Sequence, residues 1–169
     1  GTIGNAFWYV SPITTTITPA DTLSGVERVE YNQNGAGWQT GTSVAGSDGV
    51  NTTVLRVYDM AGNMASGSVT VKVDTVPPLI THALSGTAGS NGWLVSPSTV
   101  SATVDDATSG VNGEPEVSFD AGSTWQSVPV VLNDGEYKMT FRAFDVEGNQ
   151  GSAALNAYIE TTATALKFV

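Results

Sequence analysis

The chain has 169 residues, no cysteine, and a formal net charge of −10 at pH 7 from 16 acidic and 6 basic side chains. The lack of cysteine excludes disulfide cross-links, thiol catalysis and thiolate metal sites. The negative charge repels nucleic-acid phosphates and anionic lipid surfaces, and no apolar run approaches the roughly 20 residues of a membrane-spanning helix. We therefore expect no nucleic-acid partner and no membrane insertion.

The chain repeats itself with an offset of 85 to 87 residues. Residues 8–12 (WYVSP) align with 93–97 (WLVSP), and residues 21–26 (DTLSGV) align with 106–111 (DATSGV). Further along the chain, Trp38 aligns with Trp125, and the R-x-x-D-x-x-G-N string of residues 56–63 aligns with that of residues 142–149. Ordered landmarks of this kind indicate two copies of one structural unit.

Short stretches of each copy alternate apolar and polar residues, as half-buried strands do. In the first copy, Leu55 and Val57 should face a core with Arg56 outside. The same reading turns Val69, Val71 and Val73 inward, and in the second copy it turns inward Tyr137, Met139, Phe141, Ala143, Leu155, Ala157 and Ile159. Asp and Gly-Asn between these stretches favour hairpin turns. About seven strands in roughly 85 residues predict a small all-β sandwich.

The repeat predicts two domains and a short tail. Domain 1 comprises residues 1–75, domain 2 residues 76–162, and residues 163–169 form a C-terminal strand. The domains join at Asp74 to Pro78 (DTVPP), where two prolines restrict the backbone.

The two copies differ at their first strand. Residues 79–84 supply this strand in domain 2, whereas residues 1–4 of domain 1 align with residues 86–89, beyond that strand. Domain 1 is therefore expected to lack its first strand, and residues 163–169 stand where the first strand of a next domain would lie. A sandwich without an edge strand exposes unpaired backbone groups and part of its core, so we expect this edge to be filled.

The quoted motifs, together with V-K-V-D-T-V-P-P before the second copy, resemble bacterial Ig-like repeat domains of secreted and cell-surface proteins. The resemblance covers nearly the whole chain. It implies two tandem immunoglobulin-like β-sandwiches in an extracellular or cell-surface protein, with a role in spacing, adhesion or assembly. In the second copy, residues 160–164 (ETTAT) lack the linker's two prolines.

These observations lead to a functional hypothesis: the chain is a structural subunit of a surface stalk, adhesin or filament. The C-terminal strand of one copy would fill the missing first strand of the next copy, giving head-to-tail growth. In a competing interpretation the chain is a fragment of a longer array, with neighbouring Ig-like domains as its partners, or the edge is filled within the molecule. The expected assembly residues are the donors Ala165, Leu166, Lys167, Phe168 and Val169 and the acceptors Trp8, Val10, Ile13 and Ile17.

No set of residues predicts catalysis, so we expect no enzyme. The sole histidine, His82, lies on a predicted strand without a partner acid or nucleophile in its motif. Residues 118–125 match S-x-D-x-G-x-T-W, known as an Asp box, whose Asp and Gly organise a turn and do not carry catalysis.

Calcium and surface glycans are the two ligands that residues of this sequence could bind. Calcium prefers six to eight oxygen ligands, and its weak candidates are the loop residues Asp21, Asp59, Asp74, Asp106 and Asp145; no contiguous calcium loop is present. Surface glycans are the second, because Trp8, Trp38, Trp93 and Trp125 could stack on sugars. A core role explains their recurrence more simply, so a carbohydrate-binding accessory module of a secreted protein is the alternative function.

Overall fold

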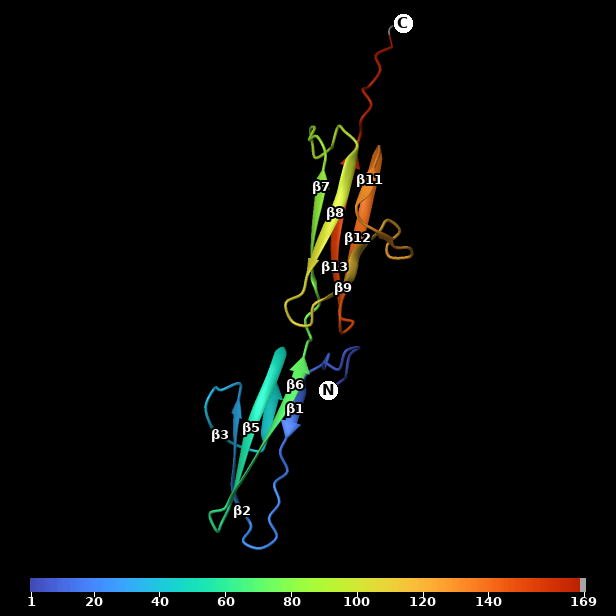
Figure 1. Ribbon diagram of the computed structural model, residues 1–169. Helices are drawn as coiled ribbons and strands as arrows, with labels where there is room; N and C mark the ends of the chain where they lie inside the picture. Colours follow the sequence, from blue (N-terminus) through green and yellow to red (C-terminus); the bar gives the residue numbers. More distant parts are fainter. Residues whose placement is uncertain (168–169) are drawn as a thin grey trace. The chain divides into compact units, whose positions relative to one another are not determined.

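The computed structural model describes residues 1–167, which form 13 β-strands and no helix (Figure 1). The predicted all-β class is confirmed. Contacts divide the chain into two compact units, Gly1–Val76 and Pro77–Val169, which are described separately below.

The second unit is a sandwich of two antiparallel sheets. One sheet has the order β11-β8-β7 and the other the order β10-β9-β12-β13. The first sheet consists of β7 (Leu79–Ser85), β8 (Ser98–Asp105) and β11 (Val130–Leu132). The second consists of β9 (Val111–Ser118), β10 (Gln126–Ser127), β12 (Gly135–Asp145) and β13 (Gln150–Ile159). The connection between β12 and β13 is the antiparallel hairpin that the sequence predicts.

The core of the second unit lies between these sheets and follows the predicted alternation. Met139, Phe141 and Ala143 of β12 are buried, as are Ala157 and Ile159 of β13. Strand β7 contributes Ile80 to this core, and its His82 ring stacks on the ring of Phe141 with centroids 5.5 Å apart.

The first unit repeats this plan with one strand fewer. Its four-stranded sheet has the order β3-β2-β5-β6, but its second sheet holds only β1 and β4. The strands are β1 (Ile13–Thr16), β2 (Val26–Gln33), β3 (Gln39–Thr40), β4 (Ser43–Gly46), β5 (Gly49–Asp59) and β6 (Met64–Val73). Among the described residues of this unit, none forms a counterpart of β7.

Equivalent backbone hydrogen bonds fix how the two units correspond. In the first unit, Tyr9 donates its N–H to the carbonyl of Lys72 (2.8 Å) and accepts one from Asp74 (2.9 Å). Leu94, Tyr158 and Glu160 form the same pair of bonds in the second unit, at 2.8 and 2.9 Å. Residues 1–10 thus occupy the place of residues 86–95 and leave the place of β7 unfilled.

The first unit also has a more polar interior. Asn51, which is 1% exposed, occupies the position of Tyr137. Its amide donates to the carbonyls of Ser47 (2.6 Å) and Gly49 (3.2 Å), and its carbonyl accepts from Gln33 Nε2 (3.1 Å). Buried Thr53 occupies the position of Met139. Because these polar groups are satisfied, the unit folds around a smaller apolar core.

A close approach in the second unit yields the first prediction. A Cβ placed on Gly151 of β13 would lie 2.1 Å from the carbonyl oxygen of Pro78, whereas one placed on Gly67 of β6 meets nothing within 4 Å. We expect Gly151→Ala to lower the free energy of unfolding by roughly 1–3 kcal/mol, because backbone must move. Gly67→Ala should change it by less than about 1 kcal/mol. Calorimetry of both variants checks this, and equal effects would contradict the close approach.

Candidate functional site: the open edge of the first unit

The second unit shows how the edge is normally covered. Strand β7 pairs with β8 from Leu79↔Asp105 to Ser85↔Thr99 (Figure 1). It also contacts β12 and β13 of the facing sheet. Beneath it, Phe141 is 0% and Ala143 2% exposed. Strand β7 therefore completes one sheet and closes the core at the same time.

The corresponding residues of the first unit are uncovered. Leu55 and Val57 replace Phe141 and Ala143 and are only half-buried, and Ala65, which replaces buried Gly151, is exposed. The β5–β6 and β12–β13 hairpins have the same register. The difference in burial between their side chains therefore follows the presence of β7 over the second hairpin.

Two hollows lie along this uncovered face. One, of about 200 Å³, is lined by Ile17, Leu55, Val57, Ala65, Ser66 and Gly67. The other, of about 170 Å³, shares Val57 and Ala65 and extends towards Asp21 and Asp59. We call this continuous surface the open groove; it follows the position that Pro78 and β7 occupy in the second unit.

The sheet edge beside the open groove is also shortened. In β8, Ala102 to Asp105 pair only with β7. Their counterparts, residues 17–20, are not in a strand, and β1 ends at Thr16. Ile17 donates its N–H to the carbonyl of Thr42 (2.8 Å), and beyond it no strand partner holds the backbone extended.

The structure separates the four expected acceptor residues. Only Ile17 lines the open groove. Ile13 lies on β1, paired with Gly46. Trp8 and Val10 lie in the loop before β1, where the Lys72 ammonium lies 5.3 Å from the centre of the Trp8 ring.

The sequence did not identify most of the residues that line the groove. Leu55 and Val57 were expected to face a core, and Ala65, Ser66 and Gly67 were not singled out. A signal was available: aligning β6 with β13 places Ala65 and Gly67 opposite Gly151 and Ala153, and small residues in one strand mark a place where another backbone comes near.

Three of the expected donor residues are described. Ala165, Leu166 and Lys167 are exposed and form no strand, and Leu166 is 83% exposed. Phe168 and Val169 lie outside the described residues. Upstream of them, Thr161 donates its N–H to Asp134 (2.9 Å) just as Thr75 does to Asp48 (2.6 Å). This equivalence fixes the register of the tail relative to the segment that leads into β7.

The candidate calcium residues cap loops. Asp106 Oδ1 accepts the N–H groups of Thr108, Ser109 and Gly110 at 2.8–3.1 Å. Asp21 accepts those of Leu23 and Gly25 in the same way. These two aspartates thus act as Asx-type turn residues that hold the loops after β8 and β1, respectively.

Asp59 and Asp145 organise the hairpin turns. Asp145 accepts the backbone N–H of Asn149 (2.8 Å) and its side-chain amide (2.6 Å), and Asp59 does the same with Asn63 at 2.8 and 2.7 Å. The bonds from Asn63 hold the pKa of Asp59 below its ordinary value. These residues therefore have structural partners without any ion.

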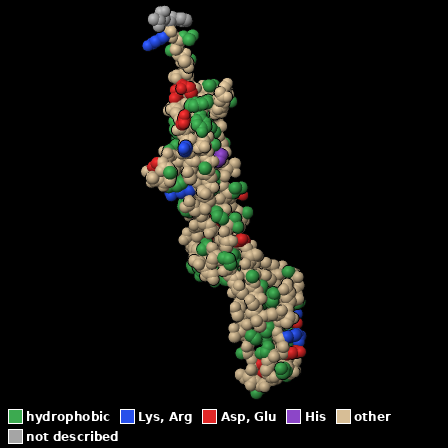
Figure 2. Space-filling view, turned by 180° about the vertical axis from the view of Figure 1, so that it is seen from behind, with side chains coloured by type: hydrophobic (Ala, Val, Ile, Leu, Met, Phe, Trp, Pro, Cys, Tyr) green, Lys and Arg blue, Asp and Glu red, His purple; other side chains and the backbone are tan. Residues whose placement is uncertain are grey.

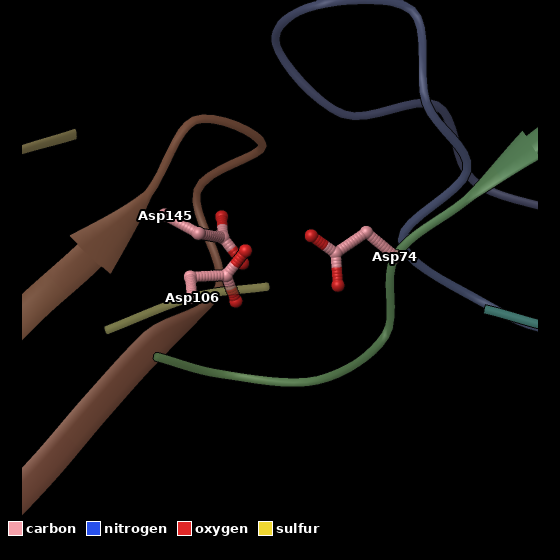
Figure 3. A group of neighbouring side chains, drawn as sticks. All are labelled: Asp74, Asp106 and Asp145. Atoms are coloured by element: carbon pink, nitrogen blue, oxygen red, sulfur yellow. The ribbon is translucent and has the colours of Figure 1, made fainter. Parts of the chain in front are cut away.

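Within the second unit, Asp106 and Asp145 come from different loops and bring carboxylate oxygens within 4.8 Å of each other (Figure 3). Asp74, also drawn in Figure 3, belongs to the first unit and accepts the N–H of Val76 at 3.2 Å. Two carboxylates provide fewer oxygens than calcium prefers, so calcium binding stays a prediction.

The Asp box forms a closed turn. Asp120 accepts hydrogen bonds from the Ser118 hydroxyl (2.7 Å) and from the N–H and hydroxyl of Thr124 (2.8 and 2.6 Å). The Trp125 indole N–H donates to the carbonyl of Gly122 (3.0 Å). The bonds from Thr124, the largest cause, and from Ser118 lower the pKa of Asp120 to about 2. All these groups are engaged in holding the turn.

The tryptophans before β3 and β10 each carry a cation on one ring face. The Arg56 guanidinium lies 3.7 Å from the centre of the Trp38 ring, and that of Arg142 lies 4.3 Å from Trp125. Arg142 is held in turn by Glu116 at 2.7 Å. These recurring cation–π contacts fasten each hairpin to the sheet and occupy a face that a sugar would need.

Comparisons with known proteins give little more than a distant likeness. No protein-family model and no curated protein matches the chain. Among solved structures, the chain is similar to fibronectin(III)-like modules of Clostridium thermocellum CbhA, with 12% identity, a TM-score of 0.35, and coverage of 99% of this chain and 95% of that one. In residues 1–167, no helix is long and apolar enough to cross a membrane.

The second prediction concerns Asp106. We expect Asp106→Ala to lower the free energy of unfolding by about 1–2 kcal/mol, because three N–H groups lose their acceptor. Asp106→Asn keeps an acceptor oxygen and should lose less than half as much. Denaturant unfolding measures both. Thermal melts of the wild type and the variants in millimolar Ca²⁺ and in chelator test the metal. If calcium binds, Ca²⁺ raises the melting temperature of the wild type and raises that of Asp106→Asn by less. Identical melting temperatures in Ca²⁺ and in chelator would contradict calcium binding.

The third prediction concerns pH. Because the folded-state pKa of Asp120 is about 2 and its ordinary value is 3.8, its stabilising contribution is fully present above pH 3.8. It is lost as the pH falls towards 2. We expect the melting temperature to fall more steeply between pH 4 and pH 2 in the wild type than in Asp120→Asn. Parallel profiles for the two proteins would show that the Asp120 charge does not stabilise the turn.

Proposed function

We propose that the chain is a non-enzymatic, extracellular structural subunit of a surface stalk, adhesin or filament. The C-terminal residues 163–169 of one copy enter the open groove of the next copy's first unit. The observation that carries this proposal is the uncovered face at Leu55, Val57 and Ala65, where the second unit buries the equivalent residues beneath β7.

β-Strand addition suits this surface for two reasons. An added strand supplies hydrogen-bond partners to the exposed backbone of an edge strand, and its alternate side chains fill apolar hollows. The edge beside β1 and the open groove provide both kinds of site. In the second unit, β7 does both: it pairs with the edge of β8 and places Ile80 in the core.

The proposed contact joins two different surfaces, a tail and a groove. Heterologous contacts of this kind generate open-ended chains of subunits unless the geometry closes a ring. The net charge of −10 keeps neighbouring assemblies apart. Over the face seen in Figure 2, uncharged polar side chains and backbone predominate. The extracellular placement is supported by the resemblance of the sequence motifs.

The carbohydrate-binding alternative receives less support. A sugar platform needs open indole faces, and Trp38 and Trp125 each have one face against a guanidinium. In the second unit, Trp93 lies against Tyr158 with ring centroids 5.6 Å apart. The tryptophans are better explained as parts of hairpin and loop packing.

The fourth prediction tests assembly directly. At rising protein concentration, we expect the intact chain to form polymers in analytical ultracentrifugation and fibres by negative-stain microscopy. A chain lacking residues 163–169 should stay monomeric. At dilution, where both proteins are monomeric, they should show the same circular dichroism and melting, because the described tail residues form no strand; only the intact chain should melt at a higher temperature as its concentration rises.

Polymers of the truncated chain, or a monomeric intact chain at all accessible concentrations, would contradict strand donation. The latter result would favour the competing interpretation, in which a neighbouring domain of a longer array supplies the strand.

A further inference from the structure

The register of the proposed contact can be derived from the chain itself. Thr75 and Thr161 make equivalent hydrogen bonds, so the offset of 86 residues holds up to the start of the tail. Carried forward, it places Leu166 at the position of Ile80, Lys167 at that of Thr81 and Phe168 at that of His82. The internal β7 thus serves as a template for the donor strand.

The template defines which donor side chains face the groove. In β7, Ile80 is buried and His82 half-buried, whereas Leu79 and Thr81 are exposed. Side chains alternate along a strand. The corresponding tail residues have the same alternation: Leu166 and Phe168 are apolar, and Lys167 between them is charged.

The open groove is apolar where the inward-facing donor residues would lie. Leu55 occupies the position of Phe141, on which His82 stacks. Phe168 of the donor would therefore lie over Leu55, a fully apolar contact in the hollow that Ile17 and Val57 also line. A charged Lys167 facing outward keeps its ammonium in water.

Two differences from the template weaken the beginning of the contact. Ala65 carries the methyl group that Gly151 lacks, and in the second unit a Cβ there would lie 2.1 Å from the carbonyl oxygen of Pro78. The donor backbone at Thr164, the counterpart of Pro78, must therefore lie farther from β6. In addition, Pro19 stands in place of Val104, the partner of Ile80, and offers no N–H.

From these observations we propose that a second copy of this chain docks through residues 166–169, antiparallel to the edge at residues 16–19, with Leu166 and Phe168 in the open groove and Lys167 in solvent. This inference rests on the proposed function and specifies its contact. Residues 163–165 act as a spacer with little binding of their own.

The test uses the full chain with Leu166→Asp and Phe168→Asp as an acceptor that cannot donate. The probe is a fluorescent peptide of residues 161–169, and binding is followed by anisotropy. In the peptide, Leu166→Asp should weaken binding roughly tenfold or more, because a leucine leaves an apolar site. Ala165→Asp adds the same single negative charge at a spacer position, and Lys167→Asp changes the charge by two units at an outward position; each should change binding less than about threefold.

Each outcome decides a separate point. If Lys167→Asp abolishes binding and Leu166→Asp does not, the strand docks one residue out of register, and the inference fails while strand donation stands. If Ala165→Asp weakens binding as much as Leu166→Asp, the spacer assignment is wrong. If the unchanged peptide does not bind the acceptor, both the inference and the proposed function fail.

Discussion

The burial of each unit's core depends on whether a strand of the opposite sheet covers the β12–β13 type of hairpin. In the second unit, β7 covers it, and Phe141 and Ala143 lose nearly all contact with water. Hydrophobic burial of this kind is the main favourable contribution to folding. The first unit has the same hairpin without the cover, so its apolar face is available for another segment.

The first unit is nevertheless folded, because other interactions replace the missing strand. The aspartates that hold the loops and the hairpin turns make equivalent hydrogen bonds in both units. The buried amide of Asn51 ties Ser47, Gly49 and Gln33 together. A satisfied polar network of this type specifies one arrangement of the strands even where apolar contact is reduced.

Much of the fold could be predicted from the sequence. Period-two alternation identified the inward residues of β12 and β13, and the Asp and Gly-Asn turns identified their hairpins. The comparison of the two copies also located the absent strand. Of the residues that line the open groove, only Ile17 was among the predicted acceptors. Ala65 and Gly67 were not, because their exposure depends on a strand that is distant in sequence. Trp8 and Val10 were expected at the groove from their closeness to it along the chain, and chain proximity is a poor guide to position in a sandwich.

Strand β7 has a further consequence for the architecture of an assembly. Because β7 belongs to the second unit itself, the place beside β8 that the first unit leaves open is already occupied there. In the proposed assembly, each copy contributes the open groove of its first unit and the tail that follows its second unit. An assembly built through the proposed heterologous contact would have two chemically different ends, one with an empty open groove and one with a free tail.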